Sequence, residues 1–225
     1  MSTVSVNLSF RLLAQAPLGA QAPEETGGQW WWAEDGDRHA WLHLQPELGL
    51  SRPRFHFHLG RVVHAAPELG LYQVQPTLLL GHDATGEAEL SAFGGDTTLW
   101  PALIDHALAT VRAVRPEGTL LLVELPGWRD AQGHSPFWHG LVRHFAPLAG
   151  TGLVERLGPA FSSHLGPLLP RQPIHGALLS PETQAALGRP ADAAQPLLHA
   201  LRASGFSDWR HVRIDDGGPV WARPV

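Results

Sequence analysis

Apolar residues alternate with polar ones through most of the first hundred residues, which is the pattern of strands that bury one face. The pattern begins with Val4, Val6, Leu8 and Phe10. Two alternating segments flank Asp35-Gly36-Asp37, which predicts a hairpin turn between them. The strands expected after the first one cover residues 29–34, 38–44, 54–63, 71–80 and 89–93.

The second half of the chain changes to helical spacing. Residues 98–114 carry apolar side chains three and four positions apart, which predicts an amphipathic helix with Pro101 in its first turn. Residues 119–125 are almost continuously apolar, which predicts a buried central strand. Shorter helices are expected at 136–145, 181–187 and 193–203, and the last strands at 212–214 and 219–222.

The order of these elements predicts one α/β (α+β) domain over residues 1–225. A strand meander would occupy about residues 1–93, and a half that mixes helices and strands about residues 94–225. The expected architecture is a twisted mixed β-sheet flanked by helices.

The composition excludes several classes of function. The 21 acidic residues outnumber the 16 basic ones, all arginine, so no positive surplus is available to displace counterions from a nucleic acid. The absence of cysteine excludes disulfides, thiolate metal sites and cysteine nucleophiles. No apolar run reaches the ~18 residues of a membrane-spanning helix, and no basic residue precedes the apolar N-terminal stretch as in a signal peptide. We therefore expect a cytoplasmic protein with no membrane or nucleic-acid partner.

Several short motifs follow one another along the chain. They are Val63-His64-Ala65-Ala66-Pro67-Glu68-Leu69-Gly70-Leu71-Tyr72, Pro76-Thr77-Leu78, Asp83-Ala84-Thr85-Gly86-Glu87-Ala88-Glu89-Leu90, His134-Ser135-Pro136-Phe137-Trp138, Leu169-Pro170-Arg171-Gln172-Pro173-Ile174 and Asp216-Gly217-Gly218-Pro219. In this order they resemble motifs of the bacterial arginine N-succinyltransferases, from about residue 28 to the C-terminus.

That resemblance implies the acyl-CoA N-acyltransferase (GNAT) fold. It also implies transfer of a succinyl group from succinyl-CoA to the α-amino group of arginine or a related amine. Succinyl-CoA, or another acyl-CoA, would be a co-substrate, and no permanently bound cofactor is expected.

Three features of the chain differ from that family. Only a loop separates Leu13 from Gln29, where the family has a helical stretch. Residues 94–98 replace a basic acyl-CoA loop and contain no basic residue. Ala191 stands where the family has a histidine proposed as proton donor. These differences leave an alternative open, a catalytically silent family member that acts as a companion subunit or a small-molecule-binding module.

Glu89 is the candidate catalytic carboxylate, which would accept a proton. Acyl transfer to an amine needs an acceptor for the amine proton and donors for the developing oxyanion. Glu89 begins the strand that forms one wall of the acyl-CoA cleft in the GNAT fold. Two alternatives remain: Glu89 and Asp83 together hold a guanidinium group, or Glu89 is an ordinary acid at the start of a strand.

His64, Thr85 and Ser135 are further candidates within the matched motifs. His64 is expected just after a strand, where a neutral imidazole suits a general base near pH 7; alternatively its ring fixes a turn. Thr85 and Ser135 are candidate substrate contacts, and Ser135 is also placed to cap a helix.

Phe93, Gly94 and Gly95 are the candidates for acyl-CoA binding. Backbone N–H groups before a helix can bind phosphate, and the two glycines precede the expected helix at 98–114. Asp96 places a negative charge beside that site, and the alternative is a plain glycine turn.

A metal site is a weaker hypothesis. His56 and His58 lie two residues apart on an expected strand, so their side chains leave the same face, a spacing that can bind zinc. The third ligand would come from His43, His64 or His82. No sequence motif of metal ligands is present, and we expect no metal.

The run Trp30-Trp31-Trp32 bears on partners. In a strand, two of these rings point to one face and one to the other. Loss of the family's early helices would uncover part of this apolar surface, and such patches mark interfaces. We therefore expect a homodimer or a hetero-complex with a paralogous subunit.

Overall fold

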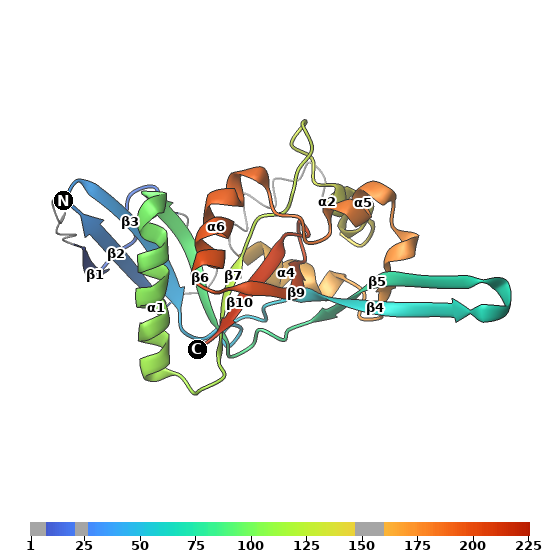
Figure 1. Cartoon of the computed structure of the whole chain (residues 1–225), viewed down its shortest axis with the longest axis horizontal. Helices are drawn as coiled ribbons and strands as arrows, with labels where there is room; N and C mark the ends of the chain where they lie inside the picture. The colour runs from blue at the N-terminus through green and yellow to red at the C-terminus, as the bar shows by residue number, and fades with distance from the viewer. Residues whose placement is uncertain (1–7, 21–26, 147–159) are drawn as a thin grey trace.

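A single mixed sheet organises the chain in the computed structural model, which describes residues 8–20, 27–146 and 160–225 (Figure 1). Within these ranges the ten strands lie in the order β1-β2-β3-β6-β7-β10-β9-β4-β5-β8. Only β6 and β7 run parallel; every other pair is antiparallel. The strands are β1 Ser9–Leu13, β2 Gln29–Asp35, β3 Arg38–Gln45, β4 His56–Ala66, β5 Leu71–Gly81, β6 Ala88–Gly95, β7 Leu120–Glu124, β8 Ile174–His175, β9 Ser207–Arg213 and β10 Pro219–Pro224.

The helices are short apart from the one that follows β6. The α-helices are α1 Trp100–Val114, α2 Pro136–Gly140, α4 Phe161–Leu165, α5 Pro181–Ala186 and α6 Gln195–Ala203. The 3-10 helices are η1 Pro67–Leu69, η2 Thr97–Leu99, η3 Val142–His144, η5 Gly166–Leu168, η6 Gly176–Leu178 and η7 Asp192–Ala194. In the part of the chain described here, no helix is long and apolar enough to cross a membrane.

Most of the predicted elements are confirmed. The β2–β3 hairpin closes through Gly36 and Asp37, α1 has Pro101 at its start, and β7 lies centrally between β6 and β10. Of the first predicted strand, Phe10 lies in β1, which starts at Ser9 among the described residues; Val4 and Val6 lie outside them. The helix predicted at 136–145 divides into α2 and η3, since the backbone at Leu141 leaves the helical region.

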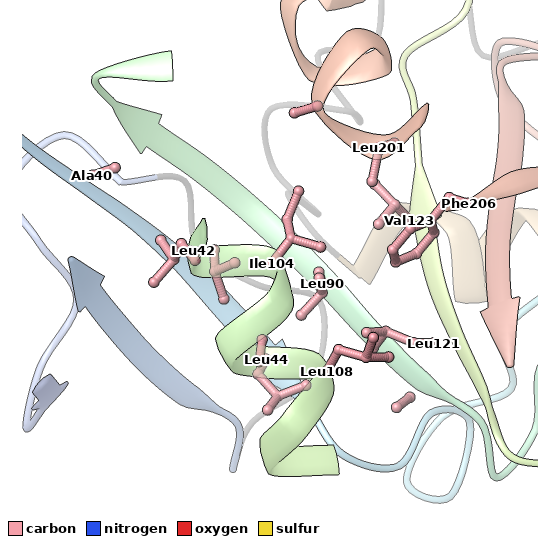
Figure 2. Close-up of a cluster of buried hydrophobic side chains, with 14 of the residues drawn as sticks. Ala40, Leu42, Leu44, Leu90, Ile104, Leu108, Leu121, Val123, Leu201 and Phe206 are labelled. Atoms are coloured by element: carbon pink, nitrogen blue, oxygen red, sulfur yellow. The ribbon is translucent and has the colours of Figure 1, made fainter. Parts of the chain in front are cut away.

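The larger hydrophobic core lies between α1, α6 and one face of the sheet (Figure 2). The buried residues of α1, among them Ile104 and Leu108, recur three and four positions apart. This spacing places them in one apolar stripe, which faces the sheet. Leu90 of β6 and Leu121 of β7 belong to the same cluster of buried side chains as this stripe. A second core joins α2 and α4 to β4, β5 and β9, with the buried rings of Phe57 and Phe137 in edge contact.

The parallel strands β6 and β7 pair over only two residues and then separate. Ala88 pairs with Leu121 and Glu89 with Leu122, and no later residue of β6 pairs with β7. Figure 2 shows the two strands moving apart beyond this point, with Leu201 and Phe206 close to Val123 on the helix side. We call this opening the fork.

The hairpin of β4 and β5 projects away from the rest of the molecule (Figure 1). β4 pairs with β9 only at His56–His58, and β5 pairs with β8 only at Thr77 and Leu78. The strand residues within 61–76 therefore pair, within the described sheet, only with each other. We call residues 61–76 the arm.

Candidate functional site

Glu89 occupies the base of the fork on the face of the sheet opposite α1. Its neighbours Ala88 and Leu90 are core residues of the α1 side, so alternation turns Glu89 to the other face. There it meets Arg54, whose Nη2 lies 2.8 Å from Glu89 Oε1. Both side chains are less than a tenth exposed. The predicted catalytic acid is thus a buried member of an ion pair rather than an ordinary exposed acid.

Glu124, at the end of β7, forms the second carboxylate of this group. Arg54 donates from Nε to Glu124 Oε1 at 2.8 Å, and His56 Nε2 lies 2.7 Å from the same oxygen. Burial alone would raise the pKa of Glu124, but the charges of Arg54 and Arg213 and the His56 hydrogen bond lower it well below its usual range. Glu124 is therefore ionised at neutral pH. One alternative from the sequence was that Glu89 and Asp83 together hold a guanidinium group. In the structure Glu89 shares the guanidinium of Arg54, a residue of the chain itself, with Glu124 instead.

The charged group continues from Glu124 toward the turn at residues 215–218. Arg213 Nη1 lies 3.7 Å from Glu124 Oε2, while its other nitrogens contact Asp215 at 2.7 Å and Asp216 at 3.1 Å. These carboxylates outweigh burial and raise the pKa of Arg213 well above its usual value. Burial and the neighbouring Asp215 raise the pKa of Asp216, more than Arg213 and two backbone N–H groups lower it.

A cavity of about 250 Å³ lies at the end of this charged group. Ser135, Trp138 and Phe161 line one side, and Asp215 and Asp216 line another. Ser135 is buried, and its hydroxyl caps α2 by accepting the N–H of Trp138 at 3.2 Å. Ser135 therefore has the predicted capping role and also lies in a cavity wall.

The glycines before α1 are explained by close packing. A Cβ at Gly94 would lie 2.3 Å from the Trp41 ring, and Gly95 has a φ of +78° with the His39 carbonyl 2.3 Å from the position of a Cβ. Asp96 caps η2 by accepting the N–H of Thr98 at 2.9 Å and also accepts the Thr98 hydroxyl at 2.6 Å. The hydroxyl bond first, and then the N–H bond, lower the pKa of Asp96. An anionic side chain thus already occupies a backbone donor that a phosphate would use.

The other acyl-CoA candidate, Phe93, packs near the start of α1. Its ring lies 5.8 Å from that of Trp100, whose Nε1 donates to the Gly94 carbonyl at 3.1 Å. Phe93, Gly94 and Gly95 therefore share the end of β6, on the fork wall that continues from Glu89.

The structure separates His64 from these residues. His64 lies inside β4, not after it, pairs with Gln73 in the arm and is exposed. The expected strand at 54–63 continues to Ala66 because the arm extends the hairpin, so the placement of His64 after a strand was wrong. His64 and Glu89 do not belong to one site within this chain.

Asp83 and Thr85 lie in the turn between β5 and β6. Asp83 Oδ2 is 2.9 Å from Nε2 of His211, so this carboxylate does not join Glu89 in holding a guanidinium. The Thr85 hydroxyl donates to the His82 carbonyl at 2.8 Å and stabilises the turn. Asp83 therefore contacts β9, next to the charged group but outside it.

His56 and His58, the candidate metal ligands, lie in different surroundings. His56 is buried against Glu124 while His58 is exposed and lies near His211. Among the residues that the structure describes, no group of three His, Cys, Asp or Glu side chains is arranged to hold a metal.

The tryptophan run is less exposed than predicted. Trp30 is buried, Trp31 packs on the α1 side, and Trp32 stacks on His39 and Trp41. The arm instead carries a group of large exposed apolar side chains close together in the chain: Val63, Leu69, Leu71, Tyr72 and Val74.

Sequence reasoning missed Arg54 and Glu124, and it considered His56 only as a metal ligand. Two signals were available. Glu124 is the only charged residue of the apolar run at 119–125, and Arg54 and His56 share one face of the alternating segment that became β4. A charged residue inside a buried strand needs a buried partner. The residues on one face of an alternating segment, such as Arg54 and His56, are the candidates for that partner.

The profile of one protein family, described as "Arginine N-succinyltransferase beta subunit", matches residues 34–225. Arginine N-succinyltransferase subunit beta of Pseudomonas aeruginosa is 31% identical over 179 residues, which are 77% of this chain and 53% of that protein. Arginine N-succinyltransferase of Enterobacter sp. (strain 638) is 30% identical over 183 residues, or 79% of this chain and 53% of that protein. The chain spans about half the length of these curated relatives.

A solved structure, arginine/ornithine succinyltransferase subunit AI from Pseudomonas aeruginosa, superposes with a TM-score of 0.67 and 25% identity. The match covers 92% of this chain and 62% of that one. The chain therefore belongs to the arginine N-succinyltransferase family and has a GNAT-like fold.

Proposed function

We propose that this protein is an N-acyltransferase that moves a succinyl group from succinyl-CoA to the α-amino group of arginine or a related amine. The observation that carries the proposal is the fork between β6 and β7, in a chain of this family. Beyond Glu89, the edge of β6 that faces β7 has no strand partner in the described sheet, so its backbone groups are available to the amides of an acyl-CoA arm.

The donor's phosphates would be held weakly. The sequence has no arginine or lysine between Arg61 and Arg112. Within the described residues, the one arginine that contacts this region is Arg38 of β3, at 3.3 Å from Thr98 Oγ1, and it lies between the carboxylates of Asp35 and Asp96. Asp96 already caps η2, which leads into α1. Ala191 donates its N–H to the Pro126 carbonyl at 2.8 Å, at the exit of β7, where its methyl group supplies no proton to a leaving thiolate. We infer slow turnover with a donor affinity in the micromolar range or weaker.

For Glu89 the surroundings favour positioning over proton abstraction. The Arg54 guanidinium already occupies a carboxylate oxygen of Glu89 at 2.8 Å, so this oxygen is engaged within the protein and does not face an incoming amine freely. Glu89 is the last residue of β6 that pairs with β7, and its ion pair links it to Arg54 in the segment before β4. Arg54 also contacts Glu124, so the same guanidinium holds β7. Glu89 would thus hold the walls of the fork at the spacing that the thioester needs.

Direct binding of succinyl-CoA tests the proposal. A titration at low salt should give saturable binding with a dissociation constant in the micromolar range, and acetyl-CoA should serve as the comparison donor. A folded protein that binds neither thioester would overturn the proposed activity and leave the catalytically silent alternative.

We also propose a protein partner, as a homodimer or a hetero-complex with a paralogous subunit. The arm supports this, because Val63 pairs with Val74 and Ala65 with Tyr72 on one apolar face, and isolated two-stranded ribbons are marginal in water. Val63 is 53% and Tyr72 70% exposed. The description of the matched family as a beta subunit also supports a complex.

A further inference from the structure

We propose that the cavity lined by Ser135, Trp138, Phe161, Asp215 and Asp216 binds a small ligand that carries a guanidinium or ammonium group. We propose further that this ligand is the acyl acceptor. The second statement rests on the proposed function, whereas the binding of a cation does not.

The size of the cavity selects the class of ligand. Its volume of about 250 Å³ lies just below the range of roughly 300–1,000 Å³ typical of sites for drug-sized molecules. It suits a free amino acid or a simple amine, and it is far too small for coenzyme A. An acceptor, not the acyl donor, therefore fits.

The charges around the cavity favour a cation. Arg213 contacts three carboxylates, those of Glu124, Asp215 and Asp216, and Glu124 is shared with Arg54. Asp215 and Asp216 thus share the Arg213 guanidinium. Among the described residues, the other arginine of the cavity wall, Arg129, forms no ion pair with either aspartate and donates to the Gly133 carbonyl at 3.0 Å, so a surplus of negative charge stays on the Asp215–Asp216 side. Burial makes such a surplus unfavourable, and a ligand cation would offset it.

The remaining walls suit the rest of such a ligand. The rings of Trp138 and Phe161, with centroids 6.0 Å apart, offer faces on which a guanidinium can stack. Arg129 lines the cavity and is itself exposed, so it can meet a carboxylate at the other end of an amino acid.

The cavity lies next to the exit of β7. A Cβ at Gly127 would lie 2.2 Å from the Asp216 carbonyl oxygen, and one at Gly218 would lie 2.1 Å from the Leu125 carbonyl oxygen. The turn at 215–218 therefore packs directly on the segment that leaves β7, one wall of the fork. A ligand in the cavity is close to where the thioester would lie, and Arg213 joins its wall to Glu124.

Calorimetric titration of the full chain with L-arginine, without acyl-CoA, tests the site. L-Citrulline, the neutral isostere of arginine, should bind at least about 10-fold more weakly, the equivalent of one charge-assisted contact. Asp215→Asn should weaken arginine binding by about the same factor, while Asp37→Asn, at the remote β2–β3 turn, should not change it. Equal binding of citrulline and arginine, or full affinity in Asp215→Asn, would overturn the proposal.

A second readout covers the case in which Asp215→Asn fails to fold. Arginine should change the tryptophan fluorescence of the wild-type chain, and Trp138→Phe should lose most of that change. A signal that survives in Trp138→Phe places the cation elsewhere and contradicts the site.

Turnover separates the two statements. If arginine binds through Asp215 but no acyl transfer occurs, the cation site stands and the proposed activity fails. If transfer occurs and Asp215→Asn leaves the KM for arginine unchanged, the activity stands and the cavity is not the acceptor site.

Discussion

The Arg54 guanidinium lies 2.8 Å from the Glu89 carboxylate, and both side chains are buried at the point where β6 and β7 begin to separate. Arg54 also contacts Glu124 of β7, so one cation bridges the carboxylates of the two diverging strands. Bringing these charges out of water costs free energy that only close pairing recovers. The Arg54 guanidinium therefore links β6 to β7 at the base of the fork.

Replacing Arg54 should be strongly destabilising. Arg54→Met keeps much of the side-chain volume but leaves Glu89 and Glu124 without the guanidinium between them. The free energy of unfolding should fall by about 3–5 kcal/mol, the usual cost of breaking a buried ion pair. Arg52→Met, two residues earlier at an exposed position, should change it by less than about 0.5 kcal/mol. Similar urea midpoints for the two variants would show that the pair contributes little.

Glu89→Gln separates positioning from proton abstraction. The variant keeps shape and hydrogen bonding but removes the charge that Arg54 contacts. If Glu89 positions the fork, kcat falls while the pH profile of kcat/KM keeps its shape, and Glu89→Asp restores part of the rate. Loss of the acidic limb of the profile, with a fall in kcat of about 10²–10⁴-fold, would identify Glu89 as the base instead.

The order of elements was predictable from the sequence, but the pairing of charges was not. Alternation and helical spacing are local properties, and they located β2, β3, β5, β6, α1 and β7. Arg54 and Glu124 are 70 residues apart, and their contact depends on the sheet order, in which β7 and β4 are separated by β10 and β9. For His64, the sequence motif around it was visible, but the sequence did not predict how far the β4–β5 hairpin extends. That extension places His64 in the arm, away from the fork.

His43 should make stability depend on pH. Burial lowers the pKa of His43 from 6.5 to about 4, so the folded protein holds it neutral while the unfolded chain takes up a proton. Its contribution is fully present above pH 6.5 and is lost as pH falls through 4, by roughly 3 kcal/mol in total. His43→Leu should flatten the stability curve between these limits. An unchanged slope would show that other groups cause it.

Asp96 should weaken donor binding through its charge. Asp96→Asn keeps an oxygen to accept the Thr98 N–H but removes the negative charge at the start of α1. Affinity for succinyl-CoA should rise by about 2- to 5-fold at low ionic strength, and the gain should shrink in 0.5 M salt because exposed charges are screened. A weaker donor affinity in this variant would place the phosphates away from α1.

The arm should mediate self-association. Val74→Glu puts a charge on its apolar face, whereas Gln73→Glu puts the same charge on the opposite face of the same strand. Light scattering at high protein concentration should show an assembly for the wild-type chain and Gln73→Glu, and a smaller mass for Val74→Glu. A strictly monomeric wild-type chain would contradict a homodimer.

The most direct test of the central claim is release of the coenzyme A thiol from succinyl-CoA in the presence of L-arginine. The chain contains no cysteine, so a thiol reagent reads product without a background from the protein. The proposed acyl transfer predicts arginine-dependent thiol release with one succinylated arginine per thiol, and a higher KM for arginine in Asp215→Asn. A folded protein that releases no thiol above the uncatalysed rate would contradict it.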